Sequence, residues 1–364
     1  MKERPILWLK GVRRTGKTTL AGMVPDVSYF DCELPSVRRK LEDPESFLAS
    51  HGSGTIVLDE IHLLENPSQI LKIAADLFPK LRIVATGSSS LSASAKFRDT
   101  LTGRKTELLL TPMISADLDD FRQKDLERRL LHGGLPPFFL AETPKEKDFQ
   151  EWLDSYWSKD IQELFHIERR GSFLKFTELL LQQSGRMFEA SSFAAPCEVS
   201  RPTISNYLEV LKETFVAYPV RPFHSRKSSE ITAAAKVYAF DTGFICCFRG
   251  WTQLRPEDFG TLWEHLVLNE LIARLPTAEI LYWREIRGYE VDFIVRKPGK
   301  PPLAVECKWK SKQFDPKRLT KFRSRYLQGK NVVVASDVNE RYPRRYGALE
   351  VLFVPLRDSL EDLL

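Results

Sequence analysis

The sequence lacks the features of a membrane or secreted protein. Its 364 residues contain no apolar run of the roughly 18 residues that a bilayer-spanning helix needs. The N-terminus, MKERPILWLKG, has no apolar signal-peptide core. The five cysteines form no C-x-x-C pair, and neither His132 nor His166 has a His or Cys partner at the spacing of a zinc site. We therefore expect a cytoplasmic protein with reduced core thiols, no zinc and no membrane partner.

Positive charge is concentrated towards the C-terminus. The net charge is only +5, but from Arg221 onward 25 Lys and Arg residues stand against 18 Asp and Glu residues. The segment from Lys308 to Lys330 has nine basic residues and one acid, Asp315. This pattern suggests an anionic partner such as DNA, although a solvated helix face would look the same. The length and the 43% hydrophobic content predict two or three domains.

A glycine-rich loop follows the first apolar strand. Ile6–Leu9 leads into GVRRTGKTT, residues Gly11–Thr19, and a helix-forming stretch follows. Between a strand and a helix, this G-x-x-x-x-G-K-T pattern binds nucleotide phosphates, because backbone N–H groups and the helix dipole point at the anionic oxygens. Lys17 is expected to reach the β- and γ-phosphates of ATP, and the Thr18 hydroxyl to ligate Mg²⁺. The predicted ATP-contacting residues are Gly11, Arg14, Thr15, Gly16, Lys17, Thr18, Thr19 and Asp59.

A second apolar strand ends in two acids. Thr55–Leu58 leads into Asp59 and Glu60. In phosphate-loop ATPases an acid at this place holds Mg²⁺, and the glutamate beside it can polarise the attacking water, so the pair predicts hydrolysis of ATP. A third strand, Leu81–Ala85, leads to Ser88, our candidate sensor of the γ-phosphate. A helical segment between the second and third strands predicts a parallel sheet with its ligand at the carboxyl strand ends.

Three arginines have open roles. Arg13 and Arg14 lie inside the loop and either contact phosphate or are exposed. Arg104 precedes a strand at Thr106–Leu110 and could stabilise transition-state charge in its own subunit or in a neighbour's site. A surface salt bridge is the alternative for Arg104.

The middle of the chain has the pattern of a winged helix-turn-helix. A helix capped by Ser200 presents Arg201 and Thr203 at its N-terminal end, where a recognition helix meets a DNA groove. Two strands are predicted at 215–223 and 236–240, and the tip between them carries basic side chains suited to phosphate. These side chains are His224, Arg226 and Lys227. Docking of another protein is the alternative use of such a module.

Four polar residues near the C-terminus match a nuclease pattern. Glu264 lies on a predicted helix, Asp292 on one strand, and Glu306 and Lys308 on the next. Strand alternation places Glu306 and Lys308 on one face, which we expect to be the active one. Carboxylates of this kind hold one or two Mg²⁺ or Mn²⁺ ions, and a lysine positions water or phosphate, as in restriction-endonuclease-like nucleases. The alternative is a fold kept for DNA binding, with the acids tied up in salt bridges.

The order of these segments resembles a family of bacterial and archaeal AAA-type ATPases. The resemblance is carried by GVRRTGKTT, TIVLDEIH, IVATGSSS and LTGRKTELLLTP, and downstream by LHGGLPPFFLAE, AKVYAFDTGF and YWREIRGYEVDFIV. It implies a helical lid, a winged helix and a C-terminal PD-(D/E)XK domain. It also implies a homo-oligomer, such as a hexameric ring, in which a neighbour's arginine completes the site. This chain has few residues before its phosphate loop, so adenine contacts from that segment are in doubt.

We therefore expect an α/β protein in four parts. These are a phosphate-loop ATPase core at 1–116, a helical lid at 117–168, a winged helix at 169–241 and a restriction-endonuclease-like domain at 242–364. The expected function is ATP hydrolysis coupled to movement or remodelling of DNA, with branched or repair-type DNA as a substrate by analogy. The alternative is a nucleotide-controlled switch or protein-interaction ATPase with an inactive nuclease-like domain.

Overall fold

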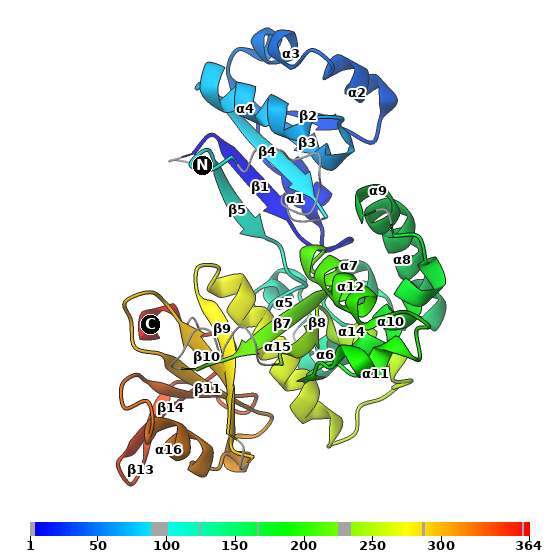
Figure 1. Ribbon diagram of the computed structural model, residues 1–364. Helices are drawn as coiled ribbons and strands as arrows, with labels where there is room; N and C mark the ends of the chain where they lie inside the picture. Colours follow the sequence, from blue (N-terminus) through cyan, green and yellow to red (C-terminus); the bar gives the residue numbers. More distant parts are fainter. Residues whose placement is uncertain are drawn as a thin grey trace. The chain divides into compact units, whose positions relative to one another are not determined.

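The structure, a computed structural model, describes residues 4–88, 101–123, 125–165, 167–224, 234–285, 288–358 and 360–364. It divides the chain into two compact units (Figure 1). Unit 1 comprises Met1–Thr111, Lys147–Leu174 and Ser205–Val216, and unit 2 comprises Pro112–Glu146, Lys175–Ile204 and Ala217–Leu364. Each unit has its own sheet, so the predicted α/β class is confirmed. The segment predicted as a lid is shared between the two units.

A five-stranded sheet forms the centre of unit 1. Its order is β2-β3-β4-β1-β5, and neighbouring strands pair in parallel. The strands are β1 Ile6–Lys10, β2 Val27–Asp31, β3 Gly54–Asp59, β4 Leu81–Gly87 and β5 Lys105–Leu109. The three predicted apolar strands lie in the middle, because buried parallel strands need apolar side chains on both faces. The edge strand β2 was not predicted.

Helices cover both faces of this sheet. The helical elements are α1 Lys17–Gly22, α2 Pro35–Lys40, α3 Pro44–His51, η1 Ile61–Leu63 and α4 Pro67–Leu77. On one face, Ile70 and Leu71 of α4 and Leu48 of α3 pack against inward side chains of the strands. On the other face, Ala21 of α1 packs against Val57 and Val84. Proline begins α2, α3 and α4, where its missing N–H costs little.

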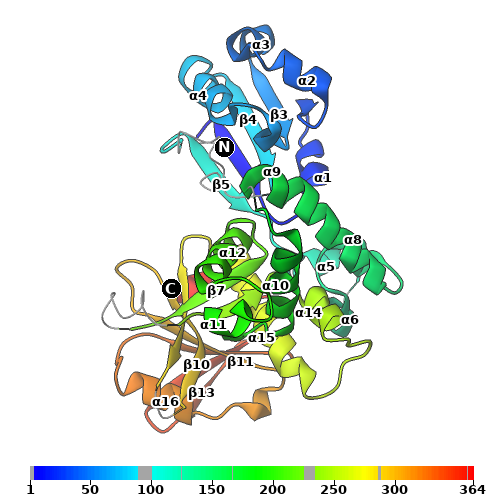
Figure 2. The same cartoon turned by 45° about the vertical axis from the view of Figure 1, so that its right-hand side comes forward.

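A helical run from the middle of the sequence also belongs to unit 1. It consists of α8 Glu146–Tyr156, the single π-helical turn η3 Trp157–Ile161 and α9 Gln162–Phe165 (Figure 2). Trp152 donates a hydrogen bond from Nε1 to the Arg13 carbonyl at 3.2 Å, and Tyr156 shares one with the Thr214 hydroxyl at 2.6 Å. The run is therefore fixed to the glycine-rich loop, and the local sequence gave no sign of this contact.

Unit 2 contains one mixed sheet of nine strands. Its order is β13-β14-β12-β11-β10-β9-β7-β8-β6. The strands are β6 Arg186–Met187, β7 Ala217–Pro222, β8 Lys236–Ala239, β9 Glu279–Arg284, β10 Glu290–Arg296, β11 Leu303–Lys308, β12 Asn331–Ala335, β13 Tyr342–Tyr346 and β14 Leu349–Val354. β7 pairs in parallel with β9, so the sheet continues across the predicted boundary at residue 241.

The remaining helical elements among the described residues belong partly to unit 1 and mostly to unit 2. They are α5 Asp117–Asp120, α6 Leu126–His132, α7 Pro136–Leu140, α10 Arg170–Gln182, α11 Ala190–Ala194, α12 Arg201–Glu213, α14 Thr242–Phe248, α15 Asp258–Arg274, η4 Ser311–Gln313, α16 Lys317–Arg323 and η5 Glu361–Leu363. Helix α12 and strands β7 and β8 form where the winged helix was expected. His224 is described at the end of β7, whereas Arg226 and Lys227 lie outside the described residues.

Two glycine motifs meet around a buried charge pair in unit 2. Arg129 is 1% exposed and donates from Nε to the Met113 carbonyl at 2.8 Å. Asp241 accepts hydrogen bonds from the backbone N–H of Gly134 at 2.6 Å and of Gly243 at 2.9 Å. The segments LHGGLPPFFL and FDTGF are thus explained by packing, because a side chain at these glycines would occupy the space of Arg129 or of the backbone.

All five cysteines are free, and four of them are buried. Within the described ranges, no helix is both long enough and apolar enough to cross a membrane.

Gly243→Ala should destabilise unit 2, whereas Gly260→Ala should not. A Cβ at Gly243 would lie 2.3 Å from the His132 carbonyl oxygen, while one at Gly260 would meet no atom within 4 Å. Overpacking of backbone against backbone should lower the free energy of unfolding by about 2–3 kcal/mol, and Gly260→Ala should raise it by about 0.5 kcal/mol. Urea denaturation measures both. Equal effects would contradict the packing explanation.

Candidate functional site

The predicted phosphate loop lies at the carboxyl end of β1. Lys17 is the first residue of α1, and Gly16 before it has a φ of 98°, a left-handed conformation that glycine adopts without strain. Gly11 lies where β5 passes, and a Cβ there would be 2.3 Å from the Leu110 carbonyl oxygen. Both glycines of the motif are therefore required by the local backbone.

Lys17 is held inside this loop. It is 5% exposed, and its Nζ donates to the carbonyls of Gly11 at 2.9 Å and Val12 at 3.1 Å. Burial lowers the pKa of Lys17, while the carboxylate of Glu60 opposes this shift. A poorly solvated ammonium group that faces the loop is well suited to bind an anion. The next two residues of the motif, Thr18 and Thr19, are exposed.

Asp59 and Glu60 end β3 beside Thr86 of β4. The Thr86 hydroxyl donates to Asp59 Oδ1 and accepts the backbone N–H of Glu60 at 2.9 Å. The hydroxyl of Tyr29 in β2 donates a hydrogen bond to Asp59 Oδ2 at 2.5 Å. Three adjacent strands thus fix the Asp59 carboxylate. Thr86 and Tyr29 were both missed, because no motif marks them in the sequence.

Glu60 combines an unfavourable backbone conformation with a carboxylate placed to act as a base. Its φ of 51° is in the left-handed region, which is unfavourable for a glutamate. Its Oε2 atom is buried and accepts no hydrogen bond within the part of the chain that the structure describes, and His62 Nδ1 lies 3.3 Å away. Burial raises the pKa of Glu60 to about 6, with Lys17 acting in the opposite direction. A carboxylate of this kind is suited to accept a proton from water.

Ser88 makes a contact that the sequence did not predict. Its hydroxyl donates to Asp160 Oδ1, from the π-helical turn η3. Arg13 Nε donates to the other oxygen, Oδ2, at 2.8 Å. Ser88 and Asp160 are both buried, at 2% and 1% exposure. Arg13 therefore lies in the site and is not an exposed loop residue, whereas Arg14 is exposed.

Arg104 lies at the opposite edge of the sheet. It precedes β5, whose first residue pairs with Ile6 at the amino end of β1, and its carbonyl accepts the Ile6 N–H at 3.3 Å. The length of β1, roughly 15 Å, separates it from the loop. Its guanidinium binds both carboxylate oxygens of Asp76, at 2.7 and 3.1 Å. The parallel register therefore places Arg104 at the amino ends of the strands, away from the loop of its own subunit, and a catalytic role for it stays a prediction.

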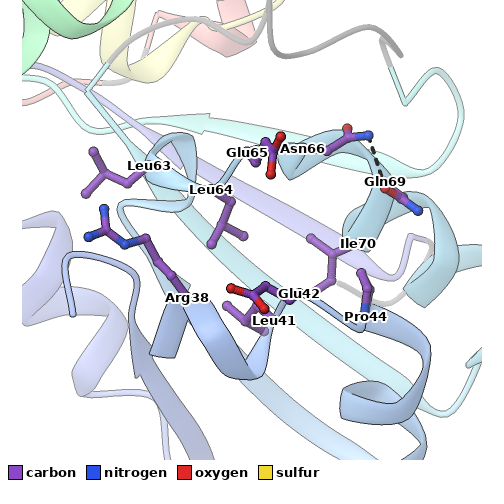
Figure 3. A pocket seen from close by; sticks show the side chains of 10 residues that line it. All are labelled: Arg38, Leu41, Glu42, Pro44, Leu63, Leu64, Glu65, Asn66, Gln69 and Ile70. Carbon is purple, nitrogen blue, oxygen red and sulfur yellow. Dashed lines mark hydrogen bonds between the residues drawn. The ribbon is translucent and has the colours of Figure 1, made fainter. Parts of the chain in front are cut away.

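A cavity of about 940 Å³ in unit 1 is separate from this site. Figure 3 shows that its walls come from α2, the turn before α3, η1 and the start of α4. Leu41, Leu64 and Ile70 form an apolar floor, and Arg38 and Glu42 stand at the rim. No residue of the phosphate loop lines it, so it is not a site for the triphosphate.

The four nuclease-type residues of unit 2 do lie together. Glu264 of α15, Asp292 of β10 and Lys308 of β11 line one cavity of about 470 Å³. Lys308 Nζ is 3.3 Å from Asp292 Oδ2 and 2.6 Å from Glu306 Oε2. Glu306 is fully buried and does not line the cavity, since the sheet is covered on both faces. The expectation that Glu306 faces an open active surface is therefore wrong.

Lysines neutralise the acids of this cluster. Glu264 accepts a hydrogen bond from the Tyr238 hydroxyl. It lies 3.7 Å from Lys236, and Lys236 also forms an ion pair with Glu290. Burial alone would lower the pKa of Lys308, but Asp292 and Glu306 raise it, so Lys308 stays charged. Glu290 of β10 thus joins the cluster through Lys236.

The donor atoms would suit Mg²⁺ or Mn²⁺, but their arrangement does not. Over the described ranges, no three Asp, Glu, His or Cys side chains lie close enough together to hold a metal ion. Lys308 occupies the space between Asp292 and Glu306 that a shared ion would need. As arranged, Glu264, Asp292 and Glu306 do not fit a metal centre.

Three family models match successive parts of the chain. Residues 3–118 match an AAA domain, residues 123–255 a domain of unknown function (DUF8612) and residues 259–356 another (DUF4143). An uncharacterized protein of Mycobacterium tuberculosis is 28% identical over 312 residues, 82% of this chain and 69% of that protein. An uncharacterized protein of Haemophilus influenzae is 23% identical and covers 79% of each chain.

Among solved structures, a Walker-type ATPase of Pyrococcus abyssi is 15% identical, with a TM-score of 0.42 over 68% of this chain and 92% of that one. The AAA match covers the whole of the parallel sheet and the loop that holds Lys17. The chain therefore begins with an AAA-type ATPase domain, which is followed by domains of two families of unknown function.

Proposed function

We propose that unit 1 binds Mg²⁺-ATP and hydrolyses it, and that the chain uses this reaction to act on DNA. The observation that carries the first part is the arrangement at three neighbouring strand ends. β1 supplies the loop with Lys17, β3 supplies Asp59 and Glu60, and Thr86 of β4 fixes both acids. A loop without this acid pair would support binding of a nucleotide but not its hydrolysis.

Each residue of the site has a chemical task in this proposal. Lys17 and the backbone N–H groups of Gly11–Thr19 bind the phosphates. The exposed hydroxyl of Thr18 and the Asp59 carboxylate would hold Mg²⁺, which supplies charge neutralisation for the leaving phosphate. Glu60, whose φ is in the left-handed region and whose Oε2 atom is buried, accepts the proton of the attacking water.

Arg104 supports an oligomer in this proposal. It lies away from its own loop and is 34% exposed on a surface edge. An arginine there can reach a neighbouring subunit's γ-phosphate if it leaves Asp76. A homo-oligomer, with a ring as its natural closed form, follows from this role.

The basic segment of unit 2 supports DNA as the partner. Lys312, Lys317 and Arg318 are exposed on η4 and α16, beside the cavity that Glu264 and Asp292 line. Phosphate contacts need such exposed cations. Arg341, another basic residue of unit 2, instead pairs with Asp358 and Asp362.

We propose further that the nuclease-like part of unit 2 holds DNA and does not cut it. The observation that favours this function is the placement of Lys308 between Asp292 and Glu306. A buried cluster in which a lysine lies between the acids does not offer converging ligands to a metal ion.

Lys17→Ala and Glu60→Gln should separate binding from hydrolysis. Removing the Lys17 ammonium should weaken ATP binding at least about tenfold, because it removes a charged hydrogen-bond donor. Glu60→Gln should keep binding and lower kcat about 10²–10³-fold, because the amide accepts no proton. Calorimetry measures binding and phosphate release measures turnover. If Glu60→Gln hydrolysed ATP at the wild-type rate, Glu60 would not be the base.

Duplex or branched DNA should stimulate the ATPase several-fold. The triple change of Lys312, Lys317 and Arg318 to Ala should abolish this stimulation and reduce the salt slope of DNA binding by about 2–3, because three phosphate contacts are lost. Lys300→Ala, an exposed change elsewhere in unit 2, is the matched control. Fluorescence anisotropy across salt concentrations gives the slope. No DNA response in the wild type would favour the nucleotide-controlled switch.

The purified protein should not cleave DNA in Mg²⁺ or Mn²⁺, because Lys308 keeps an ion from the acids. End-labelled linear and branched substrates, incubated with ATP and without it, provide the test. Cleavage that disappears in Asp292→Asn and in Lys308→Ala would overturn this part of the proposal. Cleavage that persists in both would indicate a contaminating nuclease.

A further inference from the structure

Asp160 is an acid of the candidate nucleotide site that comes from outside the parallel sheet and its connections. It lies in the π-helical turn η3 and is 1% exposed. Its two oxygens accept hydrogen bonds from two different elements, Ser88 after β4 and Arg13 in the phosphate loop. Single π-helical turns inside α-helices occur frequently at functional sites, since the extra residue redirects a side chain.

The two donors that bind Asp160 are groups to which a γ-phosphate would also bind. Arg13 lies between Gly11 and Lys17, and Ser88 follows the strand whose Thr86 holds Asp59 and Glu60. Burial would lower the pKa of Arg13, but the Asp160 carboxylate raises it above its usual value, so the pair is ionic. A phosphate oxygen is an acceptor of the same kind and carries more charge.

Asp160 also lies near the charges that would surround the terminal phosphate. Its carboxylate acts on both Lys17 and Glu60 through space. A terminal phosphate near Asp160 and Glu60 would place three anionic groups together, which is unfavourable unless one of them moves. The β-phosphate, bound by the loop backbone and Lys17, creates no such conflict.

The helical run that carries Asp160 is held at α8 by contacts that do not involve the Asp160 carboxylate. Trp152 donates to the Arg13 carbonyl, and Tyr156 shares a hydrogen bond with the Thr214 hydroxyl. Beside Asp160, Lys159 pairs with Glu33 at 2.9 Å on the surface, and an exposed pair of this type contributes little to stability. Loss of the Arg13 and Ser88 contacts would therefore loosen η3 locally while α8 keeps its own contacts.

We propose that Asp160 discriminates ATP from ADP by competing with the γ-phosphate for Arg13 and Ser88. When the γ-phosphate takes these donors, Asp160 loses its hydrogen bonds to Arg13 and Ser88, and η3 loses this contact with the loop. The presence of a triphosphate is thereby transmitted to the flanking helices α8 and α9. The inference rests on the proposed ATPase function. It assigns to Asp160 a specificity and positioning role, because it acts through Arg13 and Ser88 and not on the reacting atoms.

The test compares ATP and ADP binding in a Glu60→Gln background, which prevents turnover. Asp160→Asn keeps the shape of the side chain and removes its charge, so it should raise ATP affinity about tenfold and change ADP affinity less than about twofold. Asp160→Glu, which keeps the charge, should restore a ratio close to that of the wild type. Asp154→Asn is the control, because Asp154 lies on the same helix and pairs with Arg170 at the surface.

A second readout is independent of the affinity measurements. In the Glu60→Gln protein, ATP but not ADP should increase amide hydrogen exchange in residues 157–165, and Asp160→Asn should show the increase without nucleotide. The assignment would be overturned if Asp160→Asn changed the ATP and ADP affinities equally or weakened ATP binding. It would also be overturned if amide hydrogen exchange in residues 157–165 were the same with ATP and with ADP. If Lys17-dependent ATP binding is present in such a case, the ATPase proposal survives. If no ATP binds at all, both fail.

Discussion

The parallel register of β3, β4 and β1 is the constraint on which unit 1 depends. Leu58 pairs with Ala85, and Lys10 pairs with Gly87, so the three strands end at one edge of the sheet. Because of this register, an acid pair near residue 60 and a hydroxyl near residue 86 meet within hydrogen-bond distance, at the edge of the sheet where the loop near residue 15 begins. A shift of one residue in any strand would turn these groups to the other face.

The register also assigns different tasks to the two ends of the sheet. The carboxyl end gathers Lys17, Asp59 and Glu60, and the amino end holds Arg104. A helical run from the middle of the chain then reaches the carboxyl end through Asp160 and Trp152. The candidate site of unit 1 thus combines groups from the ends of a parallel sheet with an acid from a helical run in the middle of the sequence.

Motifs with a local physical cause were found from the sequence, and contacts made across the fold were not. Gly11, Gly16 and Lys17 were predictable because strand, turn and helix signals surround them within 20 residues. Tyr29 was missed because its strand, VSYFD, has a weak apolar pattern at the sheet edge. Asp160 was missed because it lies 147 residues from Arg13, and nothing in a polar helix distinguishes it. In unit 2 alternation placed Glu306 and Lys308 on one face, but the burial of that face depends on helices that no local pattern specifies.

The most direct test of this account is a structure with a non-hydrolysable ATP analogue and Mg²⁺. The account predicts the β-phosphate against the backbone of Gly11–Lys17, the ion between Thr18 and Asp59, and Arg13 turned from Asp160 to the γ-phosphate. A nucleotide that leaves the loop empty and occupies the cavity lined by Leu41, Leu64 and Ile70 would contradict it.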